Sequence, residues 1–137
     1  MQGDGAPARL FTVEEANALL PTLQELLAEL GQARRQLLQA ARELERLERQ
    51  RDRRNVLQLA RNLREARERL GADREALRAA FDRITSQGVQ VKNAEPGLLD
   101  FPCWRDGRIV LLCWREGEPS VAHWHDLDGG FAGRRPL

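Results

Sequence analysis

The strongest constraint on the fold is a long stretch, from Phe11 to Ile84, that is almost free of glycine and proline and carries apolar residues at helical spacing. Thr12 and Glu15, three residues apart, form a capping box that predicts a helix start. Beyond it, apolar residues fill two positions of a seven-residue repeat: Leu23, Leu30, Leu37 and Leu44, with Leu19, Leu26, Ala33, Ala40 and Leu47. This repeat predicts a coiled-coil helix over residues 12–50.

The repeat loses phase at the polar residues 51–55, and a second series then begins. Its members are Val56, Leu63, Leu70, Leu77 and Ile84. Two seams of similar length around a short polar break favour an antiparallel helical hairpin, with the second helix over 55–86, although a single bent helix remains an alternative. A homodimer forming a four-helix bundle would bury the flanking residues Leu20, Leu27 and Leu38, so we expect dimerisation through the helices.

The pattern changes after residue 88 to short extended runs at 89–92, 98–104, 109–114 and 121–125. Asp106-Gly107 between two of these runs predicts a tight type I′ hairpin turn. The glycine-rich end, 128–137, is expected to be a tail or loop. Four short strands are too few for an independent domain. We therefore expect one α+β domain over 1–137, in which a small antiparallel sheet (88–137) packs at the base of the helical hairpin.

The net charge excludes nucleic-acid binding through an overall positive charge, because 22 basic residues are balanced by 21 acidic ones, for a formal net charge of +1. A local patch is the only remaining basis for such a role. The densest basic cluster lies at the expected hairpin tip and includes Arg49, Arg51, Arg53 and Arg54. Acidic residues interleave with it, which favours a self-paired, solvated surface.

Neither a membrane span nor a secretory signal is recognisable, so we expect a cytoplasmic protein. In that reducing compartment the two cysteines, Cys103 and Cys113, are expected to be free thiols or metal ligands rather than a disulfide.

Most residues capable of chemistry fall in the expected sheet. His123 and His125 are two apart on a strand and therefore share a face; with Cys113 they form a candidate site for a divalent metal ion such as zinc. The alternative is one exposed histidine and one hydrogen-bonded to a carboxylate. Cys113 activated by a histidine would be a nucleophile, whereas an inert buried cysteine is the alternative.

Three tryptophans, Trp104, Trp114 and Trp124, are spaced ten residues apart on successive expected strands. They form either the core of the sheet or a surface on which a ligand stacks. The segment from Gly129 to Arg135 has the composition of an anion-binding loop, but a tail held against the sheet by Phe131 is the simpler interpretation.

Five motifs together resemble an uncharacterised bacterial family, catalogued as a domain of unknown function, some of whose members are labelled as division-initiation-related. The motifs are FTVEEANALLP (11–21), VKN (91–93), GLLDFP (97–102), LCWREGE (112–118) and HWHDLDGGFAGRRPL (123–137). The resemblance spans essentially the whole chain and implies no reaction, substrate or cofactor. It does single out the polar residues within the motifs as candidate ligand-binding residues: Asp100, Cys113, Glu118, His125 and Arg134.

These observations rank three hypotheses. The first is a small cytoplasmic binding or assembly protein that dimerises through its helical hairpin and presents a Trp-rich β subdomain with a polar ligand site. The alternative is a metal-binding protein or enzyme that uses His125, Cys113 and nearby carboxylates. The third is a nucleic-acid-associated protein acting through the arginine-rich tip. No reaction is predicted.

Overall fold

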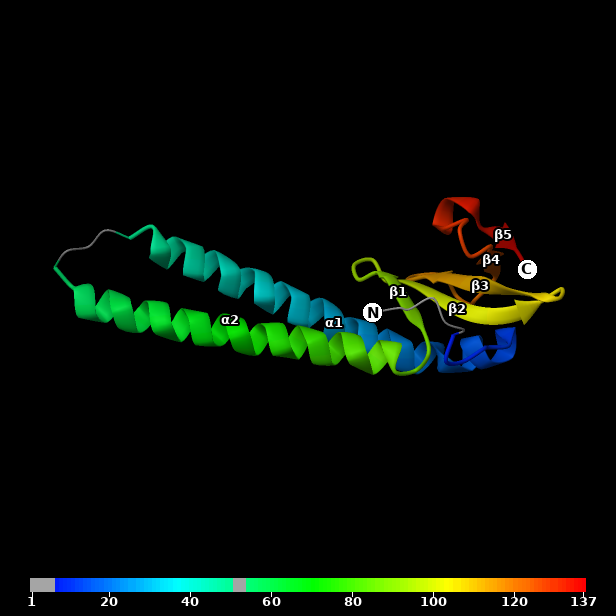
Figure 1. Cartoon of the computed structure of the whole chain (residues 1–137), viewed down its shortest axis with the longest axis horizontal. Coiled ribbons are helices and arrows are strands. Elements are labelled where there is room, and N and C mark those ends of the chain that lie inside the picture. Colours follow the sequence, from blue (N-terminus) through cyan, green and yellow to red (C-terminus); the bar gives the residue numbers. More distant parts are fainter. Residues whose placement is uncertain (1–6, 51–53) are drawn as a thin grey trace. The chain divides into compact units, whose positions relative to one another are not determined.

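The computed structural model describes residues 7–50 and 54–137 and shows two long helices followed by a five-stranded antiparallel sheet (Figure 1). The predicted α+β class is therefore confirmed. The elements are α1 (Val13–Glu48), α2 (Val56–Thr85), β1 (Gln90–Asn93), β2 (Leu98–Arg105), β3 (Arg108–Arg115), β4 (His123–His125), a 3₁₀ turn (Phe131–Gly133) and β5 (Arg135–Pro136).

The chain divides into two compact units. The hairpin unit, Glu29–Phe81, contains most of both helices, which end and restart around the polar break rather than forming one helix. The sheet unit contains the chain up to Ala28 together with Asp82–Leu137. None of the helices in the described part of the chain is both long and apolar enough to cross a membrane.

The capping box is present at the start of α1. The Thr12 backbone N–H donates to Glu15 Oε1 (2.9 Å), and the Glu15 N–H donates to Thr12 Oγ1 (3.1 Å). The hydrogen bond from the Thr12 backbone, followed by that from its side chain, lowers the pKa of Glu15. Two backbone donors that a helix start leaves free are thus satisfied.

The seven-residue repeat accounts for burial in the hairpin unit. Buried positions there include Leu30, Ala33, Ala40, Leu47 and Ala66. The prediction is wrong for Val56, the first residue of α2: it was expected in the seam but is 62% exposed. Its neighbour Leu57 (75%) and the flanking residue Leu38 on α1 (40%) are exposed as well.

Two of the three leucines expected at a dimer contact are already covered within the chain. Leu20 and Leu27 belong to the sheet unit and are buried there. Leu27 lies so close to Gly97 that a Cβ at that glycine would be 2.7 Å from Leu27 Cδ1. The seven-residue repeat could not show this for Leu27, because its neighbour Gly97 lies 70 residues further along the sequence.

The strands follow one another in space in chain order, β1 to β5, each antiparallel to the next. The predicted turn joins β2 and β3: Arg105 pairs with Arg108, and both Asp106 (φ 50°) and Gly107 (φ 80°) have positive φ. Positive angles at both central residues are the requirement of a type I′ turn.

The expectation of a strandless tail is wrong at its end. After the 3₁₀ turn, Arg135 pairs with Trp124 and Pro136 with His123, forming the edge strand β5. The Leu137 N–H also donates to the Ala122 carbonyl (3.0 Å). Backbone pairing makes this strand, and proline is tolerated because β5 is at the edge.

Side chains alternate between two faces of the sheet. The first face carries Leu99, Phe101 and Trp114, all fully buried. Phe101 meets Phe11, just before α1, in an edge-to-face contact of 5.3 Å, and the Phe11 N–H donates to the Pro102 carbonyl (2.7 Å). The start of α1 and its preceding residues therefore pack on the first face, which leaves the second face for the polar residues.

Candidate functional site

Three central strands place polar side chains on the second face of the sheet. Asp100 on β2 is the direct cross-strand partner of Cys113 on β3. Cys113 is in turn the partner of His123 on β4, and His125 lies two residues further along that strand. Residues directly opposite one another, and residues two apart on a strand, share a face.

Asp100 and His125 form a buried pair at the centre of this face. His125 Nε2 lies 3.1 Å from Asp100 Oδ2, and both residues are only 2% exposed. His125 Nδ1 is 2.7 Å from the Asp126 carbonyl oxygen, which only accepts hydrogen bonds, so Nδ1 carries a hydrogen. Nε2 and Oδ2 must then share a single proton between them.

The second oxygen of Asp100 lacks a partner. Oδ1 is buried and makes no hydrogen bond within the described part of the chain. Burial is the main cause that raises the pKa of Asp100, although His125, Lys92 and a weaker interaction with the Cys113 thiol oppose it. A buried polar atom left unpaired costs about 1–3 kcal/mol, so its presence requires an explanation.

Cys113 is a protonated thiol in this setting. Burial, with a further contribution from the Asp100 charge, raises its pKa to about 11, although Arg134 acts in the opposite direction. A nucleophilic cysteine needs a lowered pKa, so the geometry disfavours the hypothesis that Cys113 alone is a nucleophile. Cys103 is also buried and free but lies on the first face, opposite Val110.

Arg134 and Glu118 form a bidentate ion pair beside Cys113. Arg134 Nη1 donates to Glu118 Oε1 (2.9 Å) and Nη2 to Oε2 (2.7 Å). The Phe131 ring lies 4.2 Å from the Arg134 guanidinium, and Glu118 Oε1 also accepts from the Arg115 N–H (2.7 Å). Hydrogen bonding from Arg134 is the main cause that lowers the pKa of Glu118. The guanidinium is thus held in place by charge and by stacking.

The five residues singled out by the family resemblance therefore gather on one face of the sheet. Asp100 and His125 also line a pocket of about 240 Å³, here called the sheet pocket. Its other lining residues are Lys92, Leu98, Leu111, Leu127, Asp128, Gly130 and Phe131. Apolar walls around a few polar groups are typical of small-ligand sites.

The structure revises the predicted metal-ligand set. Potential donor atoms of Asp100, Cys113 and His125 lie within 4.8 Å of one another, and this trio is here called the donor cluster. His123 does not join it, because its Nδ1 faces Glu118 Oε2 at 3.8 Å. Asp100, one of the candidate carboxylates, takes its place. A two-residue turn at Asp106-Gly107 pairs positions equally distant from it, and these include Asp100 and Cys113.

The three tryptophans have different environments. Trp114 is fully buried and donates from Nε1 to the Glu118 carbonyl (3.0 Å), as expected for a core residue. Trp104 is 61% exposed. Trp124 is surrounded by three guanidinium groups at 5.2–5.9 Å, from Arg105, Arg108 and Arg135. The core interpretation thus describes Trp114 and does not extend to Trp104.

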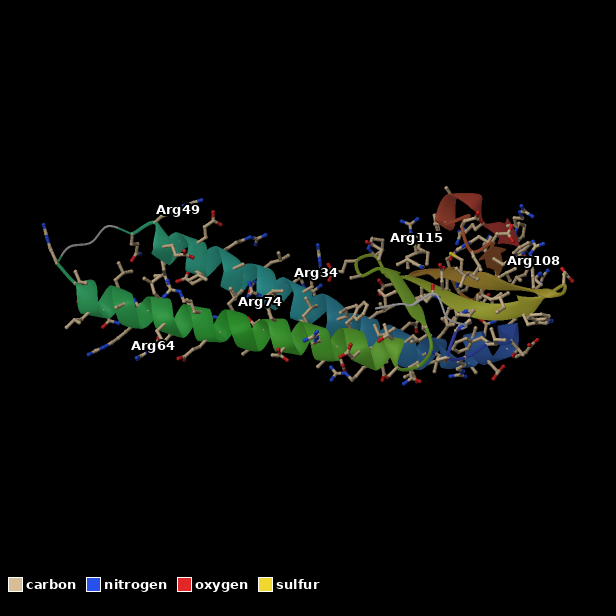
Figure 2. All side chains as sticks on the ribbon, viewed as in Figure 1. Arg34, Arg49, Arg64, Arg74, Arg108 and Arg115 are labelled. Atoms are coloured by element: carbon tan, nitrogen blue, oxygen red, sulfur yellow. The ribbon has the colours of Figure 1, made fainter. Side chains whose placement is uncertain are left out.

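The arginine-rich tip lies partly outside the described residues, which exclude Arg51 and Arg53. Arg49, labelled in Figure 2, pairs with Glu45, and Arg46 pairs with Glu43 at 2.6 Å. Arg54 is exposed. At the end of α1 the interleaved acids do pair with the arginines, as the self-paired interpretation expects.

The fold and site together define an α+β protein in which a helical hairpin accompanies a sequentially ordered antiparallel sheet with a buried Asp–His pair. The chain belongs to the family described as Uncharacterized conserved protein (DUF2203), whose model matches residues 9–137. Comparison with curated proteins and with solved structures gave no match.

Proposed function

We propose that this protein is a small binding protein whose ligand occupies the sheet pocket. The observation that carries the proposal is the unpartnered Oδ1 of Asp100, a buried oxygen on a residue that lines the pocket. Buried polar atoms are nearly always paired, so a group supplied by a ligand accounts for this oxygen.

The pocket also indicates the kind of ligand. Leu98, Leu111 and Leu127 offer apolar walls, while Asp100 accepts hydrogen bonds at the floor. A volume of about 240 Å³ suits a small molecule with a short apolar body and a donor or cationic head. The exposed Lys92 adds a positive charge among the lining residues and can pair with an anionic group on the same ligand.

Three probes that share the same isobutyl body test the proposal: isobutylamine, isovaleramide and isovalerate. Each is added to the metal-free full-length protein in EDTA, and binding is followed by saturation-transfer NMR. We expect the amine to give the strongest transfer because its head can donate to Asp100 Oδ1. The variant Leu127→Trp should abolish the signal by filling the pocket from a position that is 64% exposed.

Gln39→Trp, at an exposed position of α1 in the hairpin unit, is the control and should leave binding unchanged. If no probe distinguishes wild type from Leu127→Trp, the proposed ligand pocket is wrong.

We also propose that the hairpin unit serves assembly, as the surface of a homodimer. Leu38 and the adjacent pair Val56 and Leu57 are exposed apolar side chains on otherwise polar helices. Burial of such residues against a second copy is favourable by the ordinary hydrophobic effect.

A further inference from the structure

The donor cluster combines three types of atom that favour one class of ion. Asp100 offers a carboxylate oxygen, Cys113 a sulfur and His125 an imidazole nitrogen. Mixed oxygen, sulfur and nitrogen ligands suit zinc and related transition-metal ions, whereas calcium and magnesium prefer oxygen alone. All three residues are buried, so the ligand atoms would approach the ion from within the protein.

The orientation of His125 is an independent observation that points the same way. Its Nδ1–H donates to the Asp126 carbonyl, which fixes the ring and directs Nε2 toward Asp100. Histidines that bind metals are typically held by such a bond from the other ring nitrogen. The unpartnered Oδ1 of Asp100 supplies a second potential metal-ligand atom in the same buried place.

We propose that Asp100, Cys113 and His125 bind a divalent transition-metal ion of the zinc class, with a further coordination position open to the sheet pocket. The inference rests on the proposed function, because it concerns the floor of the same pocket: in the metal-bound protein the ion takes the place beside Asp100 that a ligand's donor group takes in the metal-free protein. Asp100 and His125 line the pocket themselves, so a small ligand in it would reach the ion.

Charge and geometry are compatible with this assignment. Binding releases to solvent the thiol proton of Cys113 and the proton shared by Asp100 and His125, and the remaining carboxylate and thiolate neutralise the ion. Ligand atoms around tetrahedral zinc are about 3.3–3.8 Å apart, as follows from bond lengths of about 2.0–2.3 Å. Donor atoms now within 4.8 Å therefore need to close by about 1 Å.

Arg134 and Glu118 support the cluster from outside. The positive charge of Arg134 lies close enough to Cys113 to favour the thiolate form of that residue, and the bidentate pair with Glu118 holds the guanidinium in place. A metal ligand must be a thiolate, so a neighbouring guanidinium supports binding.

Cobalt(II) is the probe that tests this inference, because a thiolate ligand gives it a charge-transfer band in the near ultraviolet. Metal-stripped full-length protein is titrated with cobalt chloride and then with zinc chloride. We expect one ion per chain, a thiolate band, and displacement of cobalt by zinc. Cys113→Ser should remove the band, and Asp100→Asn and His125→Gln should each weaken binding by at least about tenfold.

The chain offers matched controls for two of these changes. Cys103→Ser alters the other buried cysteine, and His123→Gln alters the other histidine of β4. Both should retain the band and the affinity. Loss of the band in Cys103→Ser with retention in Cys113→Ser would overturn the assignment.

A measurement on the wild-type protein avoids dependence on variants that fail to fold. Zinc should slow alkylation of Cys113 by iodoacetamide at least about tenfold relative to EDTA, as read by peptide mass spectrometry, and leave Cys103 unaffected. Equal protection of both thiols, or no stoichiometric metal, overturns the metal site. Neither result bears on the proposed ligand pocket, because the small-molecule probes are tested in the metal-free protein.

Discussion

Glu118 is a residue on the second face whose ionisation contributes to the stability of the fold. Its bidentate pair with Arg134 lowers its pKa below the ordinary value of 4.5. A carboxyl group with a lowered pKa in the folded state stabilises that state above its ordinary pKa. This stabilisation is lost as the pH falls through the lowered value.

Glu118→Gln should therefore reduce the free energy of unfolding at pH 7 by about 1 kcal/mol, a modest value because the pair is partly exposed. The difference from wild type should shrink as the pH falls below 4.5, where Glu118 begins to lose its charge in the unfolded chain. Urea titrations at several pH values measure both effects. Glu25→Gln, at an exposed site on α1, is the control, and a difference that stays constant with pH would contradict the explanation.

For single residues, the sequence predicted which residues belong to the site better than it predicted which contacts they make. His125, Cys113 and Asp100 were all candidates, and the alternative of a histidine bonded to a carboxylate describes the pair observed. The orientation of His123 toward Glu118 was not predictable, because it depends on where the turn after β3 places Glu118. Side-chain direction within a shared face is decided by packing, not by alternation.

The turn between β2 and β3 is the element on which the register of the site depends. Gly107 has φ 80° and open space around its Cα, so an added Cβ meets no neighbour but the backbone angle remains unfavourable. Gly107→Ala should lower the free energy of unfolding by about 1–2 kcal/mol, the cost of a left-handed conformation for a residue with a Cβ.

Gly133→Ala is the matched control, since Gly133 also has open space and its φ is not positive. We expect a change within about 0.5 kcal/mol there, as for ordinary surface substitutions. Equal losses in the two variants, measured by urea titration, would show that backbone angle is not the cause.

Strong local patterns explain which elements could be predicted. The seven-residue repeat and the capping box define α1, and Asp106-Gly107 defines the turn. β5 has only two residues, one of them proline, and its pairing partner is on β4. So short a strand carries no alternation, and its formation depends on a neighbour that is distant along the chain.

Assembly is the question that belongs to the whole molecule. We expect light scattering to return twice the chain mass of 15.6 kDa. Leu38→Glu should weaken the proposed dimer by at least about tenfold, because it places a charge on a side chain that is exposed in the single chain and would be buried against the second copy.

Gln39→Glu introduces the same charge one residue further along α1, at an exposed position, and should leave the dimer intact. A wild-type mass of 15.6 kDa at working concentration contradicts dimerisation. Equal dissociation by both variants would instead indicate a nonspecific effect of charge.

The division of the chain into two units has a consequence for the length of the hairpin unit. The sheet unit is discontinuous, since the chain leaves it at Ala28 and returns at Asp82, so the hairpin unit is an insertion within it. A coiled-coil repeat can be shortened by seven residues in each helix without changing which side chains face the seam. The length of the hairpin unit can therefore change in steps of seven residues per helix, while the residues that line the sheet pocket stay the same.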